Sequence, residues 1–176
     1  MTRSYKTEVI VLKRINFGEA DRLVTVFSKS HGKQRLVAKG IRKITSRKKG
    51  HLELFTQVQL QVAKGKNLDL ITEAATVNSF PKLRHNLNRV RIAYLLAELV
   101  DQLTAENQEQ VGVYQLLTKA FSNLNSASAS KDFIVNFEKE LLTQLGFGLP
   151  ARHDRVSLES HIFNIIERPL HSKKIK

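Results

Sequence analysis

The side chains best suited to chemistry in this sequence are cations gathered in one stretch, residues 29–50. This stretch, KSHGKQRLVAKGIRKITSRKKG, holds nine Lys or Arg residues and no Asp or Glu. It lies among strand-like segments rather than in a terminal tail. Cations held on a sheet can neutralise the phosphates of a polyanion, and that contact needs no particular base sequence. The stretch therefore predicts binding to a phosphate backbone, and the alternative interpretation is a solvated lysine-rich loop.

The charge of the whole chain favours the first interpretation. Its 176 residues include 29 Lys or Arg and 16 Asp or Glu, for a formal net charge of +13. Residues 1–80 carry 16 basic and 6 acidic side chains, whereas residues 81–176 carry 13 and 10. A field of this sign attracts nucleic acid or an anionic membrane surface. We expect the partner-binding surface in the first half of the chain.

The sequence offers little for an enzyme or a metal site. There is no cysteine, which excludes disulfides, thiolate zinc sites and a Cys nucleophile. The motifs GxxxxGK[ST], GxGxxG, GxSxG and HExxH do not occur. Of the six histidines, His153 with Asp154 and His161 come nearest to metal-ligand spacing, and we interpret them as polar loop or cap positions. We predict no metal and no cofactor.

Carboxylates are also too dispersed for catalysis. Glu19 and Asp21 are close in sequence, but they lie beside Arg22 in an expected turn, where a local ion pair is the simpler interpretation. A nuclease would need clustered carboxylates to hold metal ions. The available acids occur in separate segments, as Glu19, Asp21, Glu53, Asp69 and Glu73. We predict that the chain is not an enzyme.

The first 80 residues have the pattern of a small β-barrel. Short β-branched or alternating runs predict strands at residues 6–13, 22–28, 33–39, 52–63 and 68–77. The clearest alternation places Val58, Leu60 and Val62 on one face and glutamines on the other. Five short antiparallel strands of this spacing are typical of an OB-fold barrel.

After residue 80 the apolar spacing becomes helical. Repeats of three and four predict helices at residues 83–103, 110–124 and 133–145, with Asp132 as N-cap and Gly146 as C-cap of the third. Ser157 is expected to cap a last helix that continues to residue 168. Residues 123–130 are the most linker-like segment, and the tail from residue 171 is expected to be frayed. The prediction is an α+β chain, with an OB-fold nucleic-acid-binding domain at residues 1–80 and a helical interaction domain at 81–176.

Within the basic stretch, charged and uncharged side chains alternate along an expected strand, which places several cations on one face. On the expected strand 33–39, Lys33, Arg35 and Lys39 share one face, and the loop that follows adds five more cations. Phe17, in a turn, is the aromatic residue we most expect to be exposed for base stacking. Phosphate contacts would dominate, so binding should depend steeply on salt and weakly on base sequence. The predicted DNA-binding residues are Arg14, Arg22, Lys33, Arg35, Lys39, Arg42, Lys43, Arg47, Lys48, Lys49, Lys64 and Lys66.

A family resemblance rests on these same residues. The segments YKTEVIVLKRINFGEADRLVTVFSKSHGKQRLVAKGIRK and GHLELFTQVQLQVAKGKNLDLITEA resemble the N-terminal OB domain of the RecO family, bacterial DNA repair and recombination mediators. The pieces GEADRLVT, HGKQRLVAKG and GHLELF occur in the family's order. The resemblance continues more loosely through FPKLR, AYLLAELVDQLT and FEKELLTQLGF.

The resemblance implies a function and partners. RecO-like proteins bind single- and double-stranded DNA, anneal complementary strands, and act with RecR to help RecA displace single-strand-binding protein (SSB). They also bind the acidic, apolar C-terminal tail of SSB, for which Arg84, Arg89 and Arg91 are candidate residues here. The implied location is cytoplasmic and nucleoid-associated, without a membrane.

One departure separates this sequence from many members of the family. Those members are longer and carry a Cys-rich module after the third helix, whereas this chain has no cysteine, so zinc is not implied. We interpret the chain as a reduced member of the family rather than a fragment. The charge pattern alone fits equally well an RNA- or ribosome-associated OB-fold protein, which would recognise the 2′-hydroxyl.

Overall fold

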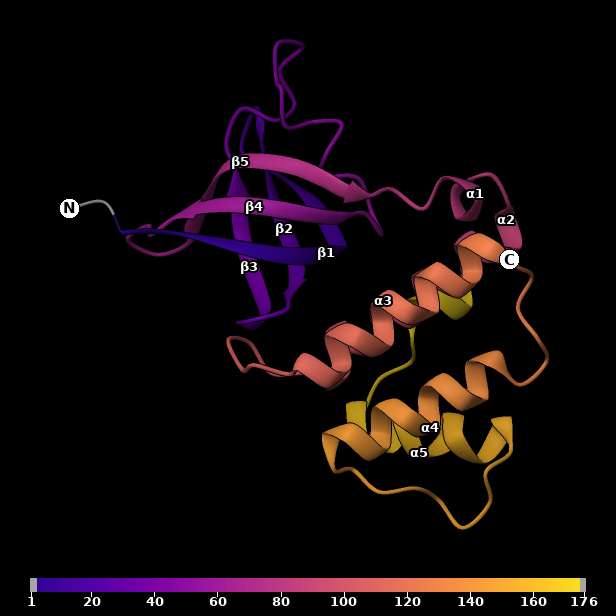
Figure 1. Ribbon diagram of the computed structural model, residues 1–176. Helices are drawn as coiled ribbons and strands as arrows, with labels where there is room; N and C mark the ends of the chain where they lie inside the picture. The colour runs from indigo at the N-terminus through magenta and orange to yellow at the C-terminus, as the bar shows by residue number, and fades with distance from the viewer. Residues whose placement is uncertain (1–2, 175–176) are drawn as a thin grey trace. The chain divides into compact units, whose positions relative to one another are not determined.

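The computed structural model describes residues 3–174, which fold into two compact units (Figure 1). The first unit contains the residues up to Ser79 together with residues 105–114. The second unit contains residues 80–104 and those from Gln115 onward. Residues 105–114 therefore belong to the first unit although 25 residues of the second unit separate them from Ser79 in the sequence. No helix in residues 3–174 is long and apolar enough to cross a membrane.

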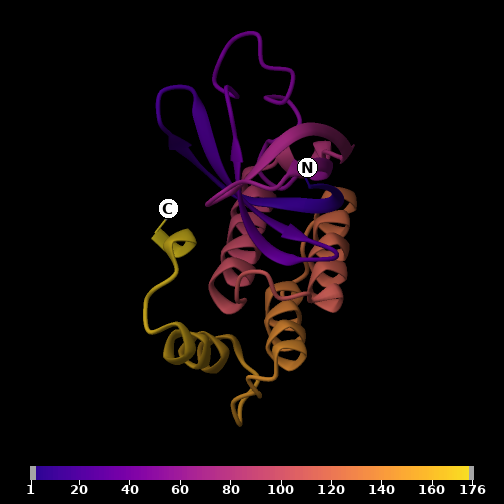
Figure 2. The ribbon, with the colours of Figure 1, turned by 90° about the vertical axis from the view of Figure 1, so that its left-hand side faces the viewer.

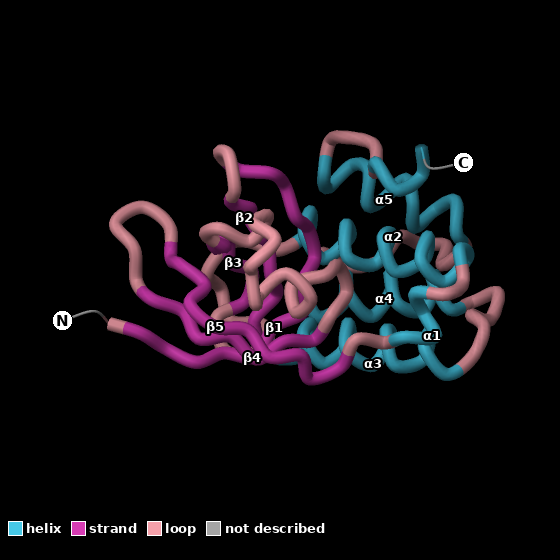
Figure 3. Tube along the Cα trace, turned by 90° about the horizontal axis from the view of Figure 1, so that it is seen from above, coloured by secondary structure: helices cyan, strands magenta, loops and turns pink. Residues whose placement is uncertain are grey.

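The first unit is a five-stranded barrel. Its strands are β1 (Ser4–Phe17), β2 (Asp21–Ser28), β3 (Gly32–Ala38), β4 (Gln57–Ala63) and β5 (Asp69–Asn78). They pair in the order β1-β2-β3-β5-β4, and β4 returns to β1, which closes the barrel. All neighbours are antiparallel except β3 and β5, which run parallel. The predicted α+β fold with a five-stranded N-terminal barrel is confirmed, and Figure 3 distinguishes these strands from the helices and from the loops that join them.

Alternating side chains build the barrel core. The inward residues of β4 are Val58, Leu60 and Val62, and each is fully buried. Their neighbours Gln57, Gln59 and Gln61 are only half-buried, as a period of two requires when one face points inward. Val9 and Val11 of β1 pack in the same cluster. The predicted alternation is therefore confirmed.

Two strand predictions need correction. The first strand continues to Phe17, beyond the predicted end at residue 13. The strand predicted at 52–63 begins only at Gln57. Before it, Phe55 has a φ of 66°, a left-handed conformation that interrupts a strand. The Phe55 amide donates to the Val11 carbonyl at 2.9 Å, and this holds the irregular segment against β1.

The helices of the chain are α1 (Pro81–Arg84), α2 (Leu87–Leu103), α3 (Val111–Ser126), α4 (Phe133–Leu145), α5 (Arg155–Ile166) and the short 3-10 helix η1 (His171–Lys174). Within the second unit, α2 packs against α1, α4, α5 and η1. Phe80 and Phe121 are fully buried there, with ring centroids 5.9 Å apart in an edge-to-face arrangement. Aromatic pairs favour this geometry because the ring edge is positive and the ring face negative.

Two helices begin at other residues than predicted, because the side chains of Asn86 and Asp154 form capping hydrogen bonds there. The helix predicted at 83–103 is divided, because the Asn86 side chain accepts a hydrogen bond from the Arg89 amide and starts α2. Asp132 is the N-cap residue of α4 as predicted, although its side chain makes no capping hydrogen bond, and Gly146 ends α4 with a φ of 76°. The last helix is capped by Asp154 rather than Ser157, since the Asp154 carboxylate accepts from the Ser157 amide.

Two segments expected to be irregular are ordered. The linker-like run at 123–130 is helical as far as Ser126. The tail predicted to fray forms η1, in which the amides of His171 and Ser172 donate to the Glu98 carboxylate at 2.5 and 2.7 Å. That prediction is therefore wrong for residues 171–174, and residues 175–176 lie outside the described residues. The acidic side chain of α2 satisfies amides that an isolated tail would leave to water.

Candidate nucleic-acid interface

Residues 39–50, here called the basic loop, leave the barrel between β3 and β4. Their backbone forms consecutive turns, with hydrogen bonds of 3.1 Å from the Lys43 amide to the Gly40 carbonyl and from the Ser46 amide to the Lys43 carbonyl. Figure 2 shows two projections from the barrel, the indigo β1–β2 hairpin and a purple loop that includes these residues. The basic loop is thus a folded projection rather than an extended tail.

Both ends of the basic loop are fixed to the barrel. At the start, Ile41 is buried and the Gly40 amide donates to the Asp21 carboxylate at 2.7 Å. At the end, Leu52 is buried in the core. The neighbouring His51 Nδ1 accepts a hydrogen bond from the Thr76 amide of β5 at 3.2 Å. The barrel therefore determines where the loop begins and ends.

The turn of the β1–β2 hairpin, residues 18–20, is joined to the basic loop. The Arg42 amide donates to the Ala20 carbonyl at 2.9 Å. The Arg42 guanidinium donates to the Glu19 carbonyl at 3.1 Å and to the Gly18 carbonyl at 3.5 Å. A depression of about 580 Å³ lies across the junction, lined by Glu19, Ala20, Asp21, Lys39, Gly40 and Lys43. Hairpin and loop therefore form one surface.

The basic loop presents cations that have no acidic partner. Lys39, Lys43, Arg47 and Lys49 are exposed, and none of them forms an ion pair with a carboxylate of residues 3–174. Lys48 is different, because its ammonium donates to the Ile71 carbonyl at 3.1 Å. Burial lowers the pKa of Lys48, and the charge of Asp21 opposes that shift. Exposed cations without a carboxylate partner are able to neutralise the phosphates of a polyanion.

The outer face of β3 is arranged differently. Arg35 of β3 is paired with Glu106, with its Nε 2.7 Å and its Nη2 3.4 Å from the two carboxylate oxygens. The Asn107 amide donates to the Lys33 carbonyl at 2.8 Å, which holds residues 105–110 alongside the start of β3. Arg35 was predicted to bind phosphate, and in the structure a carboxylate already occupies that position.

Residues 105–114 are held on the barrel by further contacts. The backbone of Gln108 lies so close to Gly32 that its carbonyl occupies the place of a side-chain Cβ. Tyr114 donates from its hydroxyl to Glu8 of β1 at 2.7 Å, and Gln57 of β4 donates to the same carboxylate at 3.0 Å. No pattern in the sequence connects Glu106 with Arg35, because 71 residues separate them.

Three other predicted cations also have partners within the barrel unit. Arg14 pairs with Glu53 at 2.9 Å, and Lys64 pairs with Asp69 at 3.4 Å. Arg22 makes a long hydrogen bond of 3.5 Å to Asn16. Lys66 is exposed in the separate turn between β4 and β5. The twelve predicted residues are therefore brought together only in part, and the basic loop gathers Lys39, Lys43, Arg47 and Lys49 without a carboxylate partner among residues 3–174.

The aromatic residues of the barrel unit differ in their exposure to solvent. Phe17 is 46% exposed at the end of β1, as predicted, whereas Phe27 and Phe55 are buried. Tyr5 donates from its hydroxyl to Asp69 at 3.0 Å and accepts from Gln34 at 2.9 Å. Burial raises the pKa of Tyr5 to about 12. Phe17 is thus the aromatic ring of these four that is most available to a base.

The three candidate arginines of the second unit also differ. Arg89 is half-buried and donates to the Asn125 carbonyl at 3.4 Å. Arg84 is half-buried in α1, and Arg91 is exposed on α2. Arg91 lines a pocket of about 620 Å³ with the apolar residues Ile92, Leu95, Ile134 and Val156. Of the three, Arg91 combines exposure with an apolar neighbourhood.

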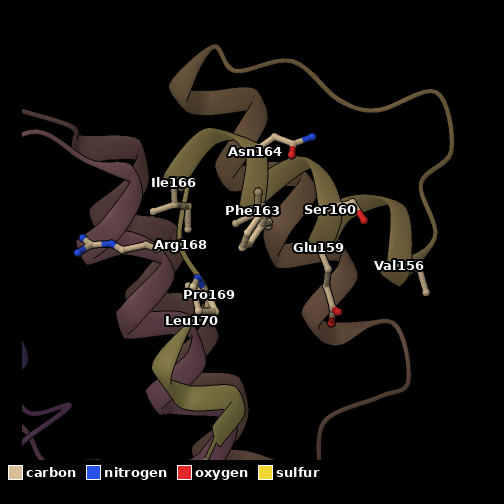
Figure 4. A pocket seen from close by; sticks show the side chains of 10 residues that line it. Val156, Glu159, Ser160, Phe163, Asn164, Ile166, Arg168, Pro169 and Leu170 are labelled. Atoms are coloured by element: carbon tan, nitrogen blue, oxygen red, sulfur yellow. The ribbon is translucent and has the colours of Figure 1, made fainter.

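A second hollow in this unit is more apolar. It has a volume of about 500 Å³ and lies between α5 and the segment that follows it. Figure 4 shows the Phe163 side chain near its centre and the Arg168 side chain pointing toward α2. Arg168 donates there to Gln102. The hollow therefore lacks a free cation at Arg168 and is less suited to an acidic ligand than the pocket beside Arg91.

Three carboxylates of the barrel unit, Asp21, Glu53 and Asp69, are engaged by hydrogen bonds or ion pairs. Asp21 accepts from the Gly40 amide, while Glu53 and Asp69 are paired with cations. Across residues 3–174, no three His, Asp or Glu side chains gather as metal ligands.

The sequence is similar to known proteins along most of its length. Residues 1–80 match the family model described as Recombination protein O N terminal, and residues 84–159 match that described as Recombination protein O C terminal. The "DNA repair protein RecO" of Roseiflexus sp. (strain RS-1) is 41% identical over 145 residues, which is 82% of this chain and 51% of that protein. The protein of the same name from Synechocystis sp. (strain ATCC 27184 / PCC 6803 / Kazusa) is 36% identical over 146 residues, 83% of this chain and 54% of that protein. The chain spans about half the length of these curated relatives.

Proposed function

Because the chain belongs to the RecO family of DNA repair proteins, we propose that it binds single- and double-stranded DNA through the basic loop and anneals complementary strands. The observation that carries this proposal is the set of unpaired cations Lys39, Lys43, Arg47 and Lys49 on a loop fixed at both ends. Such cations release counterions from DNA when they bind phosphates. The protein acts as a mediator and not as an enzyme.

The mechanism of annealing is electrostatic. Two complementary strands repel each other through their phosphates, and a surface that neutralises phosphates on both strands lowers that repulsion. The basic loop supplies these cations, and Arg42 fixes the loop to the β1–β2 turn by donating to the Glu19 carbonyl. Phosphate contacts carry no base information, so annealing should accept any sequence whose strands are complementary.

The proposal extends to protein partners. We place the acidic, apolar C-terminal tail of SSB in the pocket beside Arg91, because that pocket combines apolar walls with an exposed guanidinium. Docking there would bring the basic loop to SSB-coated strands, and with RecR it would assist the loading of RecA. Substitution R91A should weaken binding of an SSB tail peptide, whereas R152A, which removes an exposed cation outside the pocket residues, should not.

The experiment that tests the function is annealing of two complementary oligonucleotides, naked and coated with SSB of the same organism. Faster annealing that survives SSB coating supports the mediator function. Annealing of naked strands alone would leave a DNA-binding protein without the SSB contact. Equal-length RNA as competitor tests the alternative, because stronger competition by RNA would indicate an RNA-binding protein instead.

A further inference from the structure

Ile44 lies in the middle of the basic loop and is completely exposed, at 100%. Every other large apolar side chain among the described residues is less exposed, and the next is Val156 at 74%. Isoleucine is one of the residue types most often found buried. A single exposed apolar residue is ordinary at a protein surface, but the residues around Ile44 give it a specific setting.

The backbone holds Ile44 outward. The hydrogen bond from the Ser46 amide to the Lys43 carbonyl closes a turn in which Ile44 and Thr45 are the two central residues. Ile41, three residues earlier, is buried in the barrel core. The same short segment therefore buries one isoleucine and presents the other at the tip of a turn.

Cations surround this tip in the sequence and share its loop. Arg42 and Lys43 precede Ile44, and Arg47 and Lys49 follow it, all of them exposed. The hydrogen bonds of Gly40 and His51 fix the two ends of the loop, so little conformational freedom is lost when it binds. A polyanion drawn to these cations would meet an apolar side chain in their midst.

The faces of stacked bases are the largest apolar surface that DNA offers to such a side chain. DNA-binding proteins insert Ile, Leu, Met or Phe side chains between base steps and partly unstack them, while nearby cations hold the phosphates. A membrane surface fits less well, because binding to lipid requires an apolar face of several residues. Here Ile44 has polar or charged neighbours on both sides, Lys43 and Thr45.

We propose that Ile44 is a wedge that inserts between neighbouring bases of bound DNA, while the flanking cations of the basic loop hold the phosphates. This inference rests on the proposed function, since it requires that DNA binds the loop. The two kinds of residue then have separate effects. The cations determine the affinity and its salt dependence, and Ile44 determines whether the bases at the site remain stacked.

The test is a single-stranded oligonucleotide that contains 2-aminopurine, whose fluorescence increases when it is unstacked from its neighbours. The wild-type protein should increase the fluorescence on binding. I44A should lose most of that increase and bind roughly tenfold more weakly, because little apolar surface remains to be buried. I44A should keep the wild-type dependence of affinity on salt, since no cation is removed. I44L should retain the increase, and L87A is the control for an exposed apolar residue in the second unit, since Leu87 is 67% exposed.

The outcomes separate the wedge from the function on which it rests. A protein that binds DNA with a steep salt dependence but leaves the fluorescence unchanged would overturn the wedge alone. An undiminished increase with I44A would do the same. Failure of the wild type to bind DNA would overturn both proposals. Vesicles of phosphatidylglycerol provide a last arm, because loss of vesicle binding by I44A without loss of the fluorescence increase would assign Ile44 to a lipid surface.

Discussion

The basic loop and the outer face of β3 come from one run of the sequence, but their charges have different surroundings. On the loop, Lys43, Arg47 and Lys49 have no carboxylate partner among residues 3–174. On β3, Arg35 is held by Glu106 at 2.7 Å. A carboxylate can satisfy a guanidinium in the way a phosphate does. A count of cations therefore overestimates an interface unless the partners of each cation are known.

The largest expected effect comes from removing the loop charges. The variant K43A/R47A/K49A should bind single-stranded DNA about two orders of magnitude more weakly at 0.1 M salt, because three phosphate contacts are lost. Fluorescence anisotropy with a labelled oligonucleotide measures the affinity. The variant K119A/K131A/R152A removes the same charge from the second unit and is the matched control. Equal losses in the two variants would mean that net charge, and not the loop, determines binding.

The segment that carries Glu106 can be tested through Gly32. Gly32 and Gly18 both have positive φ values, of 67° and 61°, so alanine is strained at either position. Only Gly32 lies against the Gln108 backbone, whereas nothing lies within 4 Å of a Cβ at Gly18. G32A should lower the free energy of unfolding by roughly 1–3 kcal/mol, and by more than G18A. Chemical denaturation measures both, and equal effects would show that residues 105–110 do not press on β3.

Removing the carboxylate that pairs with Arg35 should make this residue of β3 available to phosphate, as the loop cations are. E106Q removes the carboxylate charge that holds Arg35 and should raise DNA affinity by up to about tenfold, the effect of one additional phosphate contact. E109Q is the control, because Glu109 is an exposed acid of the same segment. An exposed ion pair contributes little to stability, so the free energy of unfolding of E106Q should stay close to that of the wild type. If E109Q raises the affinity as much as E106Q, the gain comes from net charge.

The smallest expected effect is a pH dependence of stability at the ion pair between Lys64 and Asp69 and the nearby Tyr5. Its ammonium lies 3.4 Å from Asp69 and 5.3 Å from the centre of the Tyr5 ring. Burial is the main cause that raises the Tyr5 pKa from 10.0 to about 12, the hydrogen bond to Asp69 adds to it, and the Gln34 hydrogen bond opposes it. The folded state therefore favours the neutral phenol.

That shift predicts the direction of a pH effect. The stability from neutral Tyr5 should be fully present below pH 10 and lost as the pH rises from 10 to about 12. The Y5F variant removes the ionisation, so its free energy of unfolding should fall less steeply over this interval than that of the wild type. Parallel curves for the two proteins would contradict the account of Tyr5.

Much of the fold could be predicted because it depends on local patterns. The alternation at Val58, Leu60 and Val62 reflects a barrel wall with one buried face. Gly146 ends α4 because glycine accepts a left-handed conformation. Phe55 could not be predicted, since its φ of 66° comes from hydrogen bonds between residues 55–56 and Val11 of β1, and β-rich composition around it indicated a strand.

The candidate interface was less predictable, because it depends on contacts between residues that are distant in sequence. The sequence locates the cations but not their partners. Glu106 reaches Arg35 across 71 residues, and Asp21 reaches the Gly40 amide across 19. Each contact depends on the closed barrel and on the return of residues 105–114 to it. Pairing between distant residues is a property of the tertiary fold, and spacing along the chain carries no signal of it.

The central claim is that the basic loop, rather than the face of β3, contacts the phosphates of DNA. The most direct test is the slope of log K against log salt concentration for single-stranded DNA, measured side by side for the wild type, K43A/R47A/K49A and R35A. We predict that the loop variant reduces the slope by roughly 2 to 3, at about 0.7–0.9 per lost contact, and that R35A leaves it unchanged. A slope that falls with R35A and stays at the wild-type value in the loop variant would contradict the claim.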